Sequence, residues 1–229
     1  MHVMPATTVP SMPPIGAIGA RTLVNRPSES STPEFGLARR LRKDEELFAE
    51  SEPAAFFCKV MSGAVRTYKL LDDGRRQIDA FHLPGDIFGL ELGAKYRFSA
   101  EATTETSVIL YRRCAFEAMT TRDSDFSRQV MSATMRALAR AQDHMLLLGR
   151  KSALEKMSTF LLDMADRLSD NAQIDLPMSR IDIADYLGVT IETVSRSFTS
   201  LERDGVIDLP VRRRTILLRD KRALQRLSA

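Results

Sequence analysis

The segment from Ile183 to Ser200 constrains the fold of this chain more than any other part of it. It reads IADYLGVTIETVSRSFTS and predicts two short amphipathic helices joined at Gly188, where the chain must turn sharply. In the second helix Val194, Phe198 and Leu201 recur at i, i+4 and i+7 and form one buried stripe. The pattern predicts a helix-turn-helix, although any packed pair of helices would show similar apolar spacing.

Polar side chains lie on the opposite side of the second helix. Glu192, Ser195 and Arg196 are spaced at i, i+3 and i+4, so they share one solvent-facing side. An acceptor, a hydroxyl and a guanidinium near the start of a helix suit the base edges in a DNA major groove. The segment therefore favours sequence-specific DNA binding.

Both predicted helices have residues that can cap their N-termini. Ser179 is placed to cap the first helix, and Asp182, three residues on, gives an imperfect capping box. Thr190 is placed to cap the second helix. These caps predict where each helix begins.

Length and composition limit the possible classes of protein. A chain of 229 residues suits two modest domains, and 44% hydrophobic residues can fill their cores. No run of about 18 apolar residues could span a membrane, and the first twenty residues do not resemble a secretory signal. We expect a cytoplasmic protein with no membrane partner.

Cysteine and histidine usage argues against a metal site. Cys58 and Cys114 form no CxxC pair, and the three histidines are scattered. We therefore expect no metal and no cofactor. Because no nucleophile–base set is present, we also expect no catalytic residues, and the chain is not expected to be an enzyme. Cys114 follows Arg112 and Arg113, which could favour a thiolate, but an inert thiol is the preferred interpretation.

The chain divides into four predicted regions. Residues 1–33 hold six of the ten prolines, which predicts a flexible or extended arm. Residues 34–120, the predicted sensor-like domain, show many short strand patterns typical of an antiparallel sandwich or roll. Residues 121–149 are dominated by one long helix, and residues 150–229 hold a further helix to Leu168, the helix-turn-helix and two short strands. The last two strands predict a winged helix-turn-helix.

The long helix carries a seam that suits a second copy of the chain. From Ser127 to Leu148 no Gly or Pro interrupts it. Side chains at alternating four- and three-residue spacing resemble a coiled-coil seam. The predicted dimer interface consists of Met131, Met135, Leu138, Gln142 and Met145. The alternative is that the seam packs on the chain's own β-roll.

The C-terminal region is locally basic. From Gly205 to Ala229 seven Lys and Arg stand against two Asp, a local excess of +5. A basic patch beside a candidate reading helix is typical of DNA-binding proteins. A solvated tail would have the same composition.

The order of β-roll, long helix and winged helix-turn-helix resembles the CRP/FNR superfamily of bacterial transcription regulators. The resemblance is carried by SGAVR (62–66), LPGDIFG (83–89), LLLGRKSALEKMSTFLL (146–162) and DIADYLGVTIETVSRSF (182–198), and it covers everything except the arm. It is strongest to the FixK branch, regulators of low-oxygen genes in nitrogen-fixing bacteria. It implies an α+β fold with an N-terminal antiparallel β-roll of the cupin-like jelly-roll type.

The resemblance also implies partners and residue roles. The implied partners are a second copy of the chain, a palindromic double-stranded DNA site and RNA polymerase. The implied role is activation of transcription. The implied base-reading residues are Ile191, Glu192, Ser195 and Arg196. The implied phosphate contacts are Ser179, Arg180, Thr190, Thr193, Arg212 and Arg214. Ile191 stands where cyclic-AMP-responsive members have an arginine, which points to TTGA-like half-sites.

Two effectors known in the family do not suit this chain. Cyclic-nucleotide binders carry Gly-Glu followed by Arg-Ser, but in GLELGAKYRFSA (89–100) Phe98 precedes Ser99, and Arg97 is one place off, which in a strand points it to the other face. The arm lacks the cysteines that hold the FNR iron–sulfur cluster. We expect activity without a ligand; the alternatives are a ligand bound in the β-roll, or a ligand-binding module with no DNA role.

Overall fold

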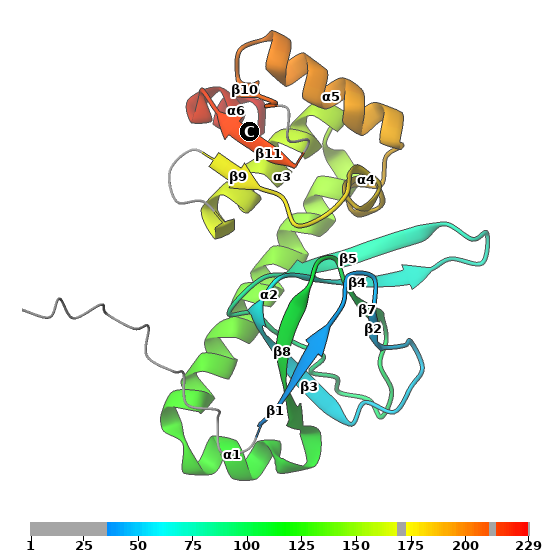
Figure 1. Cartoon of the computed structure of the whole chain (residues 1–229), viewed down its shortest axis with the longest axis vertical. Coiled ribbons are helices and arrows are strands. Elements are labelled where there is room, and N and C mark those ends of the chain that lie inside the picture. Colours follow the sequence, from blue (N-terminus) through cyan, green and yellow to red (C-terminus); the bar gives the residue numbers. More distant parts are fainter. Residues whose placement is uncertain (1–35, 169–172, 211–213, 229) are drawn as a thin grey trace, which may run out of the picture. The chain divides into compact units, whose positions relative to one another are not determined.

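The computed structural model describes residues 36–168, 173–210 and 214–228 (Figure 1). The predicted arm lies outside these residues. Of the helices in this described part, none is long and apolar enough to cross a membrane. The predicted fold class is confirmed: antiparallel sheets come first, long helices follow, and a helix-turn-helix lies near the C-terminus.

The N-terminal elements form two four-stranded antiparallel sheets, ordered β1-β8-β3-β6 and β2-β7-β4-β5. Their strands are β1 Gly36–Leu41, β2 Glu46–Phe48, β3 Phe56–Ser62, β4 Val65–Leu70, β5 Arg76–His82, β6 Ile87–Phe88, β7 Ser99–Ala102 and β8 Thr106–Arg112. The turn between β3 and β4 uses Gly63 at φ +77°, where an added Cβ would lie 2.3 Å from the Glu105 carbonyl oxygen. Only glycine fits this close approach.

Aromatic side chains fill the space between the two sheets. Phe48 stacks on Tyr96 with ring centroids 3.7 Å apart, and Phe88 lies 6.2 Å from Phe48. The Tyr96 hydroxyl donates to the carbonyl of Phe56 at 2.7 Å, which satisfies its polar end. Burial raises the pKa of the neighbouring Cys58 thiol to about 12, so this cysteine stays protonated at neutral pH.

The long helix α2 (Ser124–Arg150) follows η1 (Arg113–Ala115) and α1 (Phe116–Arg122). Asp123 caps α2, because its side chain accepts from two backbone amides of the first turn. Val130 and Ala133 pack on Phe57 of the β-roll. Figure 1 shows α2 running alongside the β-roll and on toward the C-terminal helices.

The helix after α2 begins later than the sequence pattern indicated. We expected it to start at Arg150, but α2 continues through Arg150, and α3 spans Ala153–Leu168. Ser152 and Glu155 explain this boundary, because the Ser152 amide donates to the Glu155 carboxylate at 2.6 Å and the Glu155 amide donates back to the Ser152 hydroxyl at 3.4 Å. A reciprocal pair of this kind fixes a helix start.

The C-terminal elements form a winged helix-turn-helix. A three-stranded sheet ordered β10-β11-β9 lies beside helices α3, α4, α5 and α6. The elements after α3 are β9 Gln173–Asp175, α4 Arg180–Leu187, α5 Ile191–Arg203, β10 Ile207–Asp208, β11 Thr215–Leu218 and α6 Lys221–Ser228. Strand β9 is not among the strands that the sequence pattern indicated, and it is held by pairing with β11.

Gly188 supports one prediction about stability. It lies at φ +62° after α4, a conformation that glycine adopts freely and that strains residues with a Cβ atom. Gly188→Ala should therefore lower the free energy of unfolding by about 1–2 kcal/mol. Gly149→Ala is the matched control: Gly149 is helical with nothing near its Cβ position, and alanine there should be neutral or stabilising by up to about 1 kcal/mol. Thermal denaturation of both variants measures this, and equal melting shifts would contradict it.

Candidate nucleic-acid interface

A complete capping box fixes the start of α4. The Asp182 amide donates to the Ser179 hydroxyl at 3.1 Å, and the Ser179 amide donates to the Asp182 carboxylate at 2.9 Å. The sequence had indicated only an imperfect box, because Glu or Gln is the usual residue at this position. Gly188 in the left-handed conformation ends the helix, so both predicted ends of α4 are confirmed.

The second helix, α5, presents one polar face near its N-terminus. Thr190 caps it by accepting from the Thr193 amide at 3.3 Å. Val194, Phe198 and Leu201 are buried on one side, as predicted. The other side forms what we call the reading face: Ile191, Glu192, Ser195 and Arg196, with Glu192 and Arg196 exposed and Ser195 half-buried.

Glu192 carries a negative charge on this face. The backbone amide of Glu192 and the Thr190 hydroxyl hold the pKa of the Glu192 carboxyl below its usual value, and the nearby Arg196 charge lowers it further. A carboxylate accepts hydrogen bonds only, whereas the Arg196 guanidinium donates only. The face therefore offers an acceptor and a donor in fixed positions on one helical turn.

The starts of α4 and α5 meet around a hollow of about 660 Å³. Arg180 lies over the Phe198 ring at 4.9 Å, a cation–π contact that holds its guanidinium beside this hollow. Ile191, Ser195 and Arg214 also line it, so residues predicted to contact bases and phosphates are brought together. Ile181 lines it too and is 55% exposed. Sequence reasoning missed Ile181, although an apolar residue beside a predicted cap was a usable signal.

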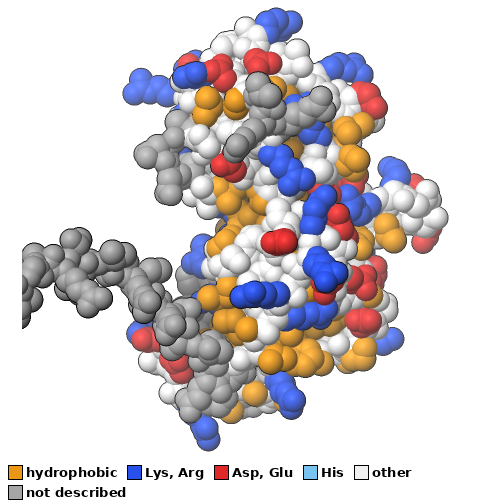
Figure 2. All heavy atoms as spheres, viewed as in Figure 1, with side chains coloured by type: hydrophobic (Ala, Val, Ile, Leu, Met, Phe, Trp, Pro, Cys, Tyr) orange, Lys and Arg blue, Asp and Glu red, His pale blue; other side chains and the backbone are white. Residues whose placement is uncertain are grey.

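Ion pairs engage part of the predicted basic patch. Lys221 pairs with Asp166 at 2.7 Å, Arg226 with Asp220 at 3.7 Å, and Arg219 with Asp208. Figure 2 shows basic side chains set among acidic ones over this part of the surface. Arg214 is exposed, whereas Arg212 lies outside the described residues. Asp208 and Asp220 already count in the local excess of +5, so of these three ion pairs only the one with Asp166 lowers that excess.

The predicted dimer seam lies on the side of α2 away from the β-roll. The seam residues are exposed: Met131 (60%), Met135 (56%), Leu138 (54%), Met145 (67%) and Gln142. The buried side of α2 carries Val130, Ala133, His144 and Leu147 instead. In the single chain, a continuous apolar seam is therefore left without a partner.

The cyclic-nucleotide cassette positions are engaged with each other. The Arg97 guanidinium pairs with Glu91 at 3.0 Å, and the Arg97 side chain is 75% exposed. Phe48 and Tyr96 stack between the sheets. Within the described residues, no group of His, Cys, Asp and Glu could hold a metal ion.

Comparison with known proteins places this architecture in a family. A model of the Crp-like helix-turn-helix domain matches residues 155–227, and a model of the cyclic nucleotide-binding domain matches residues 38–123. The nitrogen fixation regulation protein FixK of Azorhizobium caulinodans is 47% identical over 192 residues, which cover 82% of this chain and 77% of that protein. The chain belongs to the CRP/FNR family of transcription regulators, in its FixK branch.

Further relatives agree with this assignment. FixK of Rhizobium meliloti is 42% identical over 76% of this chain and 79% of that protein. The solved structure of FixK2 from Bradyrhizobium japonicum has a TM-score of 0.79 and 49% identity, covering 85% of this chain and 98% of that one. Both FixK relatives are named as proteins of nitrogen fixation regulation.

Arg196 supports a prediction about base recognition. Arg196→Ala should weaken binding to a preferred duplex by about 1–3 kcal/mol and relax the preference at one guanine, because a bidentate donor to guanine O6 and N7 is lost. Fluorescence anisotropy against a set of single-base-pair variants measures both effects. Arg128→Ala, which removes the same charge from the exposed side of α2, should leave the base preference intact. An unchanged profile for Arg196→Ala would remove it from the reading face.

Proposed function

We propose that this FixK-like protein is a homodimeric, sequence-specific transcription activator that reads a palindromic site of TTGA-type half-sites. The observation that carries the proposal is the reading face, which lies at the capped start of α5 beside the capped start of α4. Helices in this arrangement enter a major groove with their N-terminal residues against the bases. We place the protein in the cytoplasm.

Each residue of the reading face has a chemical role in this proposal. Arg196 donates to guanine, Glu192 accepts from a cytosine amino group, and Ile191 lies against a thymine methyl. Ser195 donates or accepts, so its base is less determined. Around them, phosphate contacts come from Ser179, Arg180, Thr190, Thr193, Arg212 and Arg214. The Thr190 and Thr193 hydroxyls lie 3.1 Å apart and bond each other in the free protein.

The exposed seam of α2 supports the homodimer. Three methionines and a leucine at coiled-coil spacing expose more than half of each side chain. Pairing two α2 seams around a two-fold axis buries them and relates the two reading faces by the same axis. Such a pair suits half-sites about 34 Å apart in successive major grooves.

We further propose that the β-roll acts without cyclic nucleotide or an iron–sulfur cluster. The stacked Phe48 and Tyr96 between the sheets and the Arg97–Glu91 pair support this. The second candidate is a regulator controlled by an effector in the β-roll, and the match of residues 38–123 to a cyclic nucleotide-binding domain favours it. The same DNA reading face serves both candidates.

Contact with RNA polymerase is also part of the proposed role. The turn between β4 and β5, around Leu71 to Arg76, is one candidate surface. Leu70 and Leu71 there are 64% and 41% exposed. Apolar side chains at an exposed turn suit a protein partner.

Quantitative binding to a TTGA-type palindromic duplex tests the proposed function. The purified protein alone should bind this duplex with a dissociation constant at least about a thousandfold below that for a scrambled duplex of equal length. Parallel titrations with cyclic AMP should give the same constant. Binding that appears only with the nucleotide would favour the second candidate, and equal affinity for both duplexes would refute sequence-specific reading.

The seam supports a prediction about assembly. Met135→Asp together with Leu138→Asp should convert the dimer to monomers, because carboxylates would be buried at the paired seams. Light scattering measures the mass in solution. Leu37→Asp with Leu92→Asp, two exposed apolar residues of the β-roll, is the control and should leave the dimer intact. A persistent dimer in the first variant would place the interface elsewhere.

A further inference from the structure

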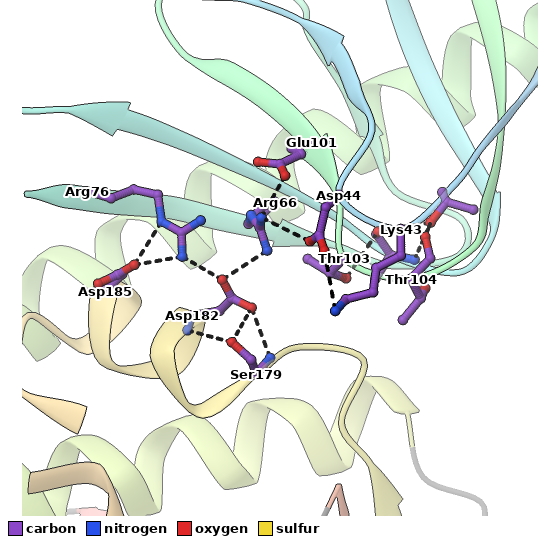
Figure 3. Close-up of polar contacts among 12 residues, drawn as sticks. Lys43, Asp44, Arg66, Arg76, Glu101, Thr103, Thr104, Ser179, Asp182 and Asp185 are labelled. Atoms are coloured by element: carbon purple, nitrogen blue, oxygen red, sulfur yellow. Dashed lines mark hydrogen bonds and ion pairs between the residues drawn. The ribbon is translucent and has the colours of Figure 1, made fainter. Parts of the chain in front are cut away.

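A buried ionic network joins the β-roll to the first helix of the helix-turn-helix (Figure 3). The Asp182 Oδ1 atom accepts from the Arg66 guanidinium at 3.0 Å and from the Arg76 guanidinium at 2.7 Å. Arg76 also pairs with Asp185 at 2.8 Å, and Arg66 with Glu101 at 2.8 Å. We call Arg66, Arg76, Asp182 and Asp185 the latch.

The latch is largely removed from water. The side chains of Arg66 and Asp182 are 8% and 5% exposed, and those of Arg76 and Asp185 are 20% and 24% exposed. Charges at such sites interact more strongly than charges at the surface, but their burial is costly unless each is paired. A buried ion pair is therefore weak evidence for stability, and a role in fixing the relative orientation of two domains is a separate hypothesis.

Both ends of α4 are attached, which fixes its direction. At the first turn Asp182 uses its other oxygen, Oδ2, for the Ser179 cap, so one carboxylate serves the helix start and the β-roll together. At the last turn the Tyr186 carbonyl oxygen lies 2.9 Å from Nε2 of His144 in α2. The same oxygen accepts from the side-chain amide of Gln77 in β5 at 3.4 Å. Two attachment points along a helix restrain its rotation as well as its position.

Fixing α4 also fixes the reading face on α5. Three residues, 188–190, connect α4 to α5, and Leu187 of α4 is buried in one core with Val194 of α5, so the position of α4 restrains that of α5. The β-roll, in turn, packs on α2, which carries the dimer seam. The latch is thus one polar link, beside the contact of His144 with Tyr186, between the dimer helix and the orientation of each reading face.

We propose that the latch performs the orienting task that an effector would otherwise perform, by holding the two reading faces of the dimer at the spacing and angle of the palindrome. The inference rests on the proposed DNA binding and deepens it. It assigns Arg66, Arg76 and Asp185 as positioning residues that contact no DNA. Their loss should impair simultaneous engagement of two half-sites while leaving each reading face able to bind one.

Arg76→Gln tests the latch, with Arg75→Gln as its matched control. Arg75 is the neighbouring residue and carries the same charge, but its side chain is 77% exposed and pairs with Asp73 of its own turn. Each full-length protein is titrated at low salt against a palindromic duplex, a duplex holding one half-site and a scrambled duplex. Arg76→Gln should lose about tenfold in affinity for the palindrome and keep wild-type affinity for the single half-site, a change typical of coupled sites.

A double-mutant cycle makes the assignment specific. Asp185→Asn alone should weaken palindrome binding, and adding it to Arg76→Gln should cost less than the sum of the two changes, because both remove one interaction. Arg75→Gln should behave as wild type on all three duplexes. Additive effects would mean that the two residues act separately and would contradict the latch.

The outcomes separate failure of the latch from failure of the proposed function. Wild-type affinity of Arg76→Gln for the palindrome overturns the latch, and so does an equal loss on the single half-site, since that reports damage to the reading face itself. If the wild-type protein does not distinguish the palindrome from the scrambled duplex, the proposed function fails, and the inference fails with it.

Discussion

One continuous apolar core joins the β-roll to the DNA-binding elements, and the rest of the structure depends on it. Ile78, Phe81 and Leu83 of the β5 region share this core with Phe160 of α3 and with Leu187 of α4. Burial of apolar surface is not directional, so this core holds the domains together without choosing the angle between them. The angle is chosen by polar contacts placed around the core.

The polar contacts converge on α4 and on the turn before β6. Asp86 in that turn accepts from Arg140 of α2 at 3.1 Å and from Arg167 of α3 at 2.8 Å. Together with the latch, this carboxylate ties the β-roll to three successive helices. Hydrogen-bonded ion pairs form only at particular distances and angles. A small number of them therefore suffices to fix the angle between the β-roll and the helices that share its core. These ion pairs therefore also set the direction in which the reading face points.

The sequence predicted features that depend on nearby residues. Helical periodicity, the caps at Ser179 and Thr190, and the turn at Gly188 lie within one or two helical turns of the residues that they organise. Strand β9 was missed because a three-residue strand has almost no periodicity, and its partner β11 lies about forty residues away. The start of α3 was misplaced because the apolar spacing continues across the boundary that Ser152 sets.

Charge partners were the least predictable part of the site. Arg66 is a charged residue in a strand, which ordinarily indicates a solvent-facing position, yet it is buried against Asp182, which is 116 positions away along the chain. The same limit applies to the C-terminal tail, where the composition gave an excess of positive charge but could not show that Lys221 pairs with Asp166 of α3. Counting charges gives a net value, whereas a fold determines which of them remain available.

The double use of Asp182 has a consequence for exchanging domains between regulators. Its carboxylate belongs to the helix-turn-helix by its capping bonds and to the β-roll by its arginines. A chimaera that joins this helix-turn-helix to another β-roll therefore keeps a folded α4 but buries a charge with no counterpart, unless arginines equivalent to Arg66 and Arg76 are grafted with it. The two domains are separate segments of the sequence, but the charge balance of one depends on residues of the other.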